Sequence, residues 1–129
     1  MRTNVVIVGG GPSGLLLSRL LSIDGIDNIV LEKQSEKHVS SRIRAGVLET
    51  GTIEMLEKAG VSDRLKKEGF NHDGIQLSFK NYGFRINLKQ LTNKHVTVYG
   101  QTEVTKDLYR IIKKENGKII NNAEDVLPQ

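Results

Sequence analysis

The first fourteen residues restrict the fold of this chain more than any other segment. An apolar run from Asn4 to Val8 leads into the pattern Gly-x-Gly-x-x-Gly, formed by Gly9, Gly11 and Gly14. A strand that runs into this pattern and continues as a helix is typical of a parallel βαβ unit. The first glycine permits a tight turn, the second removes a Cβ from that turn, and the third lets the helix pack closely on the strand. The sequence therefore predicts a Rossmann-like α/β fold.

A second apolar run, residues 28–32, ends in the acid Glu32. A carboxylate at this place can accept both hydroxyls of an adenosine ribose, and it would repel a ribose 2′-phosphate. The intervening helix begins near Pro12 or Ser13, so its free N–H groups and the Ser13 hydroxyl can bind phosphates. We expect FAD or NAD, rather than NADP, as the tightly bound nucleotide. The alternative is a structural loop that happens to be rich in glycine.

Helical patterns follow at intervals along the chain. The first helix is expected to end near Gly25, in a left-handed cap. The polar segment 33–41 has no core pattern. Three more helices are expected over residues 52–59, 62–69 and from Thr102 to a stop at Asn116 and Gly117. Thr102 is the expected N-cap of the last helix.

Other segments alternate with period two. Residues 75–79 and 84–88 predict an antiparallel β-hairpin with one buried face and a turn at residues 80–83. Residues 95–99 predict another strand, and residues 118–121 predict a third parallel strand of the sheet. The expected fold class is therefore α/β, with a parallel sheet, a Rossmann-like βαβ unit and an antiparallel hairpin.

Composition excludes several other classes of protein. The 129 residues include no cysteine, which rules out disulfides, thiolate metal sites and cysteine nucleophiles. The three histidines, His38, His72 and His95, lack metal-ligand spacing, so no metal site is expected. The net charge of +4 is spread over the chain and few residues are aromatic, so we expect no nucleic acid partner. Without a membrane-length apolar run or a signal peptide, we expect a cytoplasmic protein with no membrane partner.

Several acids lie at helical spacing from lysines and arginines. They are Glu54, Glu57, Glu103 and Asp107. We interpret them as members of solvated helix faces, not as an acid/base pair.

Two longer strings carry a resemblance to a known family. They are residues 41–49, Ser-Arg-Ile-Arg-Ala-Gly-Val-Leu-Glu, and residues 96–105, Val-Thr-Val-Tyr-Gly-Gln-Thr-Glu-Val-Thr. Together with the glycine-rich opening and residues 25–28, they resemble the single-component flavin-dependent aromatic hydroxylases over about residues 4–125. The resemblance implies FAD as the cofactor, NADPH (or NADH) as a transient reductant and a phenolic acid such as 4-hydroxybenzoate as the substrate. It also implies a homodimer when the enzyme is complete.

The resemblance assigns cofactor contacts to positions of this chain. The glycine-rich turn and Ser13 would hold the FAD pyrophosphate, Glu32 the ribose, and residues 42–47 the flavin side of the cofactor. The polar segment after Glu32 would recognise the 2′-phosphate of the reductant, and it contains Lys33, Gln34, His38, Arg42 and Arg44. Position 33 is often Arg and position 38 often Tyr in the family, so Lys33 and His38 leave open whether NADPH is preferred over NADH. The expected cofactor residues are Gly9, Gly11, Ser13, Gly14, Glu32, Lys33, Gln34, His38, Arg42, Ile43, Arg44, Ala45, Gly46, Val47 and Gln101.

No catalytic residue is expected within this chain. The resemblance places the groups that grip and deprotonate the phenol in the part of the fold that follows. Complete relatives should be about three times as long, because an FAD domain interrupted by a substrate domain needs far more residues. We expect residues 1–129 to be the N-terminal part of one incomplete FAD-binding domain, inactive alone, with an exposed sheet edge. The alternatives are a hydroxylase of a different phenol and a stand-alone, non-catalytic nucleotide-binding module.

Overall fold

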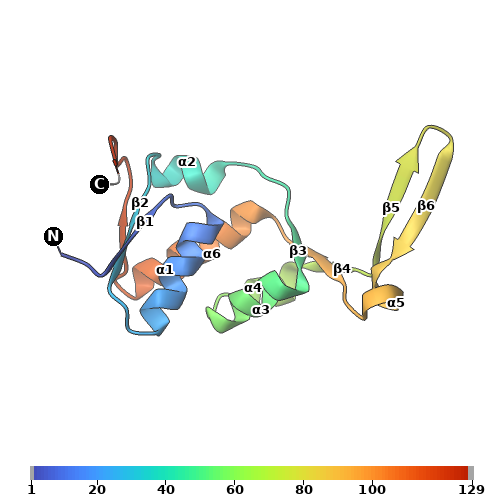
Figure 1. The fold of residues 1–129 in the computed structure, drawn as a ribbon, viewed down its shortest axis with the longest axis horizontal. Helices are drawn as coiled ribbons and strands as arrows, with labels where there is room; N and C mark the ends of the chain where they lie inside the picture. The colour runs from blue at the N-terminus through green and yellow to red at the C-terminus, as the bar shows by residue number, and fades with distance from the viewer. Residues whose placement is uncertain (1, 128–129) are drawn as a thin grey trace.

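The expected parallel sheet lies at one end of an elongated molecule (Figure 1). This computed structural model describes residues 2–127. The spatial order of the strands is β1 (Val5–Val8), β2 (Asn28–Leu31) and β8 (Lys118–Ile120), and both pairings are parallel. Helix α1 (Pro12–Ile23) joins the first two strands and packs against α6 (Gln101–Lys114). The predicted βαβ unit and third parallel strand are confirmed.

A second, antiparallel sheet forms the middle of the molecule. Its strands, in spatial order, are β3 (Val47–Glu49), β7 (Val96–Val98) and β4 (Phe70–His72). Helices α3 (Thr50–Lys58) and α4 (Asp63–Glu68) lie beside it and confirm the two predicted short helices. The main core joins this region to the parallel sheet through buried side chains of α1, α3, α4 and α6, among them Leu15, Leu56, Leu65 and Leu108.

Two helix termini differ in detail from the sequence prediction. Gly25 has φ of 74° and ends the first helix as expected. Helix α6 begins at Gln101 with Gly100 as its N-cap, so the predicted cap at Thr102 is wrong. The Thr102 hydroxyl instead donates to the carbonyl oxygen of Arg42 at 2.9 Å. That longer-range bond ties α6 to a distant segment, which local cap rules do not anticipate.

The polar segment after β2 contains a short helix, α2 (Glu36–Ser41). Its N-cap, Ser35, accepts a hydrogen bond from the His38 backbone N–H at 3.2 Å. The Glu36 carboxylate forms an ion pair with Lys113 of α6. The partly buried Val39 also packs against the core. A six-residue helix with one packed apolar side chain has no apolar stripe, so hydrophobic periodicity did not reveal it.

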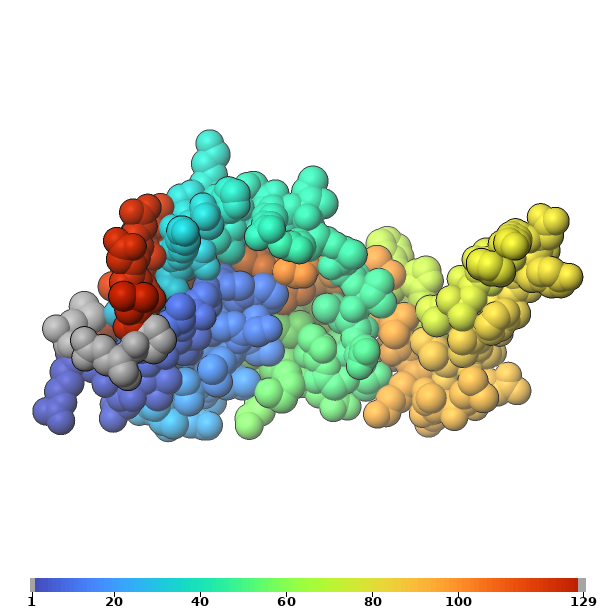
Figure 2. Space-filling model, turned by 45° about the horizontal axis from the view of Figure 1, so that its top comes forward, coloured from blue at the N-terminus to red at the C-terminus, as the bar shows by residue number. Residues whose placement is uncertain are grey.

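The predicted hairpin is present, but its buried face is not. Strands β5 (Gly74–Phe79) and β6 (Tyr82–Asn87) pair with Leu77 opposite Phe84, and α5 (Leu88–Thr92) follows. The hairpin stands away from the body of the molecule (Figure 2), and these two side chains are 43% and 61% exposed. The expectation of a buried face is wrong for this structure, because no element within residues 2–127 covers the hairpin's apolar side.

The parallel sheet also has apolar side chains open to solvent. On its edge strand β1, Val6 and Val8 are 52% and 68% exposed. Parallel strands are normally covered on both faces, so these positions form an uncovered surface. Within the described part of the chain, no helix combines the length and apolar character needed to cross a membrane.

Candidate functional site

The turn between β1 and α1 has the shape needed to receive an anion. Gly9 has φ of 110°, a conformation that favours glycine. A Cβ on Gly14 would overlap with the Gly9 carbonyl oxygen, whereas a Cβ on Gly11 would meet no atom within 4 Å. No side chain within residues 2–127 caps the N-terminus of α1. The free N–H groups of its first turn therefore face open space beside Gly11.

Glu32 is held beside this turn by backbone groups. Its carboxylate accepts the Gly10 N–H at 2.6 Å and the Gln34 N–H at 2.7 Å, one on each oxygen. Each carboxylate oxygen can accept more than one hydrogen bond, so capacity remains for two ribose hydroxyls. The sequence predicted the acid but not the two amides that orient it.

A polar cavity of about 250 Å³ gathers seven of the expected cofactor residues. They come from the glycine-rich turn, the end of β2, α2, the segment after α2 and the start of α6. The seven are Gly11, Glu32, Gln34, His38, Arg42, Arg44 and Gln101. Residues that are up to ninety positions apart in sequence thus share one cavity with an acidic and a basic side.

A second cavity, of about 420 Å³, adjoins the first and is mainly apolar. It is lined by five expected cofactor residues, Ser13, Ala45, Gly46, Val47 and Gln101, and by apolar side chains that include Leu16, Leu48 and Met55. Gln101 lines both cavities. The two spaces together can therefore receive a long ligand with one polar end and one apolar end.

The remaining expected residues lie elsewhere. Gly9 and Lys33 line a third cavity of about 560 Å³, which Glu32 also borders with residues 123–126. Gly14 packs on the strand, as its steric environment shows. Ile43 is 92% exposed and lines none of these three cavities. The structure thus separates Lys33 from His38, Arg42 and Arg44, with which it was grouped by sequence.

The segment that carries Gly46 is held against the start of α6. The Tyr99 N–H donates to the Gly46 carbonyl oxygen at 3.0 Å. A Cβ on Gly46 would overlap with the Tyr99 carbonyl oxygen and lie 2.6 Å from the Gly100 Cα. This close approach requires glycine at position 46.

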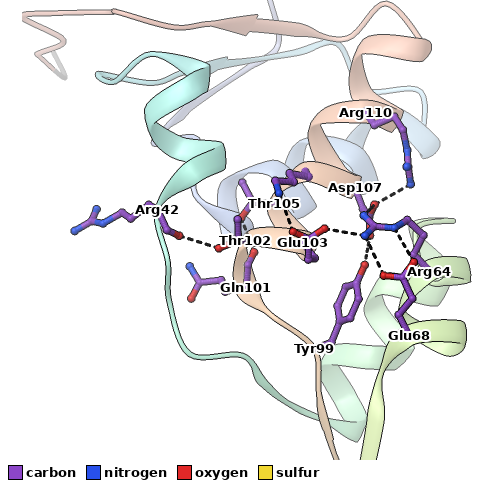
Figure 3. A network of polar contacts seen from close by, with 11 residues as sticks. Arg42, Arg64, Glu68, Tyr99, Gln101, Thr102, Glu103, Thr105, Asp107 and Arg110 are labelled. Atoms are coloured by element: carbon purple, nitrogen blue, oxygen red, sulfur yellow. Dashed lines mark hydrogen bonds and ion pairs between the residues drawn. The ribbon is translucent and has the colours of Figure 1, made fainter.

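Behind the cavities lies an ionic cluster that the sequence interpretation missed (Figure 3). Asp107 is only 2% exposed, so its interpretation as a solvated acid is wrong. Its carboxylate accepts hydrogen bonds from Arg64 and Arg110, each at 2.8 Å, and from the Tyr99 hydroxyl at 2.7 Å. A signal was present, because position 107 lies three residues after Val104 and on the apolar side of the α6 pattern.

The cluster shifts the ionisation of its members. Burial, followed by the hydrogen bond to the nearby carboxylate, raises the pKa of Tyr99. Hydrogen bonds from Lys106 and Arg64 lower the pKa of Glu103. Hydrogen bonds to Glu68, Glu103 and the buried aspartate raise the pKa of Arg64. The tyrosine therefore remains a hydrogen-bond donor throughout the neutral range.

The chain is also similar to known proteins. A family model described as "FAD binding domain" matches residues 2–127. The chain is 51% identical over 109 residues to p-hydroxybenzoate hydroxylase from Acinetobacter baylyi, a match that covers 84% of the chain and 27% of that relative. The chain thus spans about a quarter of that relative's length.

Solved structures show the same fold. The structure of p-nitrophenol 4-monooxygenase PnpA from Pseudomonas putida matches with a TM-score of 0.80 and 25% identity, over 97% of this chain and 33% of that one. Pseudomonas aeruginosa PqsL matches with a TM-score of 0.82 over 93% of this chain and 33% of that one, at 17% identity. The resemblance stated from sequence is confirmed at the level of the family.

Proposed function

The chain belongs to the FAD binding domain family, and on this premise we propose that it forms the FAD-binding part of a flavin-dependent aromatic hydroxylase. The proposed overall reaction uses NADPH and O₂ to convert 4-hydroxybenzoate to 3,4-dihydroxybenzoate. The observation that supports this proposal most is that Gln101 lines two adjoining cavities. One is polar and includes the anion-binding turn, and the other is apolar and of suitable size for a ring system. The similarity to p-hydroxybenzoate hydroxylase supports the choice of substrate.

The residues present fit the two ends of FAD. The open space beside Gly11 and the α1 N-terminus would receive the pyrophosphate, and Glu32 would accept the ribose hydroxyls. The apolar cavity beside Gly46 and Gln101 would pack against the flavin ring. When bound, FAD would supply the redox chemistry: it would take a hydride from the reductant and transfer one oxygen atom from O₂.

The basic side of the polar cavity would attract the reductant's phosphates. Arg42 and Arg44 carry planar guanidinium groups suited to bidentate phosphate contacts, and His38 lies in the same cavity. Lys33 borders a different cavity. We therefore infer that the two arginines and the histidine, rather than Lys33, would contact the pyrophosphate of the reductant, because Glu32 lines the same cavity and would repel a 2′-phosphate.

A chimera tests the proposed function. Residues 1–125 of this chain would replace the matching part of the Acinetobacter p-hydroxybenzoate hydroxylase, and NADPH oxidation would be measured with and without 4-hydroxybenzoate. We expect oxidation that rises with the phenol and yields 3,4-dihydroxybenzoate. A folded chimera that holds FAD but responds only to another phenol would favour the related hydroxylase. A folded chimera without FAD would favour a module of a different class.

A further inference from the structure

The turn that joins β7 to α6 lies between the candidate site and the buried core. On the cavity side, Gln101 lines both cavities of the candidate site. On the opposite side, the Tyr99 ring is buried, with 5% of the residue exposed. Figure 3 shows the tyrosine pointing away from Gln101 and toward Asp107. The residue behind the turn therefore does not contact the proposed ligand space, yet it precedes Gln101 by only two positions.

Tyr99 joins three segments through hydrogen bonds. Its backbone N–H donates to the Gly46 carbonyl oxygen at 3.0 Å. Its hydroxyl donates to Asp107, two turns along α6, at 2.7 Å. Arg64 of α4 holds the same carboxylate at 2.8 Å, on the other oxygen. Loss of the hydroxyl would leave the β7–α6 turn held by its backbone and by packing of the buried ring, without a side-chain hydrogen bond from position 99 to α6.

We propose that Tyr99 is a positioning residue of the proposed flavin site. Through the hydrogen bond from its hydroxyl to Asp107, it fixes Gln101 and Gly46 relative to α6. This inference rests on the proposed function, since it concerns the same cofactor site. A second bond reinforces the arrangement: Thr102 donates to the Arg42 carbonyl oxygen at 2.9 Å. The segment 42–47 is thus tied to α6 at both of its ends, once through Thr102 and once through the tyrosine.

Hydrogen exchange separates positioning from simple core stability. In the 129-residue chain, Tyr99→Phe is expected to speed amide exchange in residues 44–49 and 98–103 and to leave the rest of the chain protected. The matched control is Ser18→Ala, which also loses one buried hydroxyl bond, the 2.6 Å bond to Asn28. That bond lies between α1 and β2, so the control should not affect the two segments. Faster exchange along the whole Phe variant would show a purely structural role and overturn the inference.

Titration of FAD fluorescence supplies the second measurement. Loss of one hydrogen bond that orders the flavin site should raise the dissociation constant for FAD about three- to tenfold in Tyr99→Phe. The constant of Ser18→Ala should stay close to that of the wild type. The titration uses the chimera described above, which supplies the rest of the FAD site. If the unsubstituted chimera binds FAD and its Phe variant binds it equally well, the inference fails and the proposed function stands. If the folded, unsubstituted chimera does not bind FAD, the proposed function fails and the inference falls with it.

Discussion

At the scale of single residues, Asp107 is the most deeply buried acid of the ionic cluster in Figure 3. It accepts from Tyr99, Arg64 and Arg110 while almost wholly buried. Asp107→Asn removes the charge that Arg64 and Arg110 share, while Arg64 keeps its ion pairs with Glu68 and Glu103. We expect a loss of about 2 kcal/mol in the free energy of unfolding, measured by urea denaturation, because hydrogen bonds to a buried charged acceptor are weakened.

Glu68→Gln is the matched control for that substitution. Glu68 pairs with the same arginine at 3.0 Å, but its side chain is half exposed. Its removal should therefore cost less than about 1 kcal/mol. Equal losses for the two variants would show that burial of Asp107 contributes nothing.

Two buried tyrosines determine the expected stability at high pH. Burial raises the pKa of both Tyr99 and Tyr109 above the ordinary value of 10.0. The unfolded chain then releases these protons first, so their contribution is complete below pH 10 and is lost as the pH rises above it. Melting temperatures should fall above about pH 10, and the double variant Tyr99→Phe, Tyr109→Phe should fall less steeply. Parallel curves would contradict the assignment.

In acid, stability changes with pH in the opposite direction and falls as the pH is lowered. Hydrogen bonds from Lys106 and Arg64 lower the pKa of Glu103. Its contribution is therefore present above the ordinary pKa of 4.5 and is lost as the pH falls below it. The melting temperature of the variant Glu103→Gln should fall less steeply in acid than that of the wild type. The same fall in both proteins would contradict the proposed contribution of Glu103.

At the scale of elements, the contact between the residue 42–47 segment and α6 depends on one glycine. Gly46→Ala would place a methyl group against the Tyr99 carbonyl oxygen and force the segments apart. We expect lower stability and weaker FAD binding. Gly51→Ala is the control for stability alone, because it lies in α3 with no atom within 4 Å of the added carbon but lines the apolar cavity proposed for the flavin. That change should stabilise the chain by about 0.5–1 kcal/mol.

The sequence predicted the elements whose patterns are local. The β1–α1–β2 unit followed from glycine spacing and Glu32, because a tight turn and a close helix contact leave few alternatives. The α2 helix did not, since it is held by a serine cap, an ion pair to α6 and one packed apolar side chain, Val39. The convergence of Arg42 and Gln101 in one cavity came only from family resemblance, because tertiary pairing joins them. Alternation in the hairpin revealed an apolar face but not what covers it.

At the scale of the whole molecule, the hairpin is separate from the candidate site. Its ends lie close together, since the Lys89 N–H donates to the Asp73 carbonyl oxygen at 2.9 Å. A short glycine linker in place of residues 74–87 should therefore leave FAD binding within about twofold of wild type. It should also reduce self-association, because it removes the exposed Leu77 and Phe84. Analytical ultracentrifugation measures the self-association, and FAD titration measures the binding. Loss of FAD binding would show that the hairpin is part of the FAD site.

The central claim is that the glycine-rich turn holds FAD, and the most direct test is the flavin content of the chimera and of its Gly11→Val variant after gel filtration. The new side chain points into open space, and Gly11 has φ of −72°, which valine adopts readily. The account predicts stoichiometric FAD in the chimera and little in the variant, with equal circular dichroism and melting temperature of the flavin-free proteins. Equal FAD content in both would contradict it.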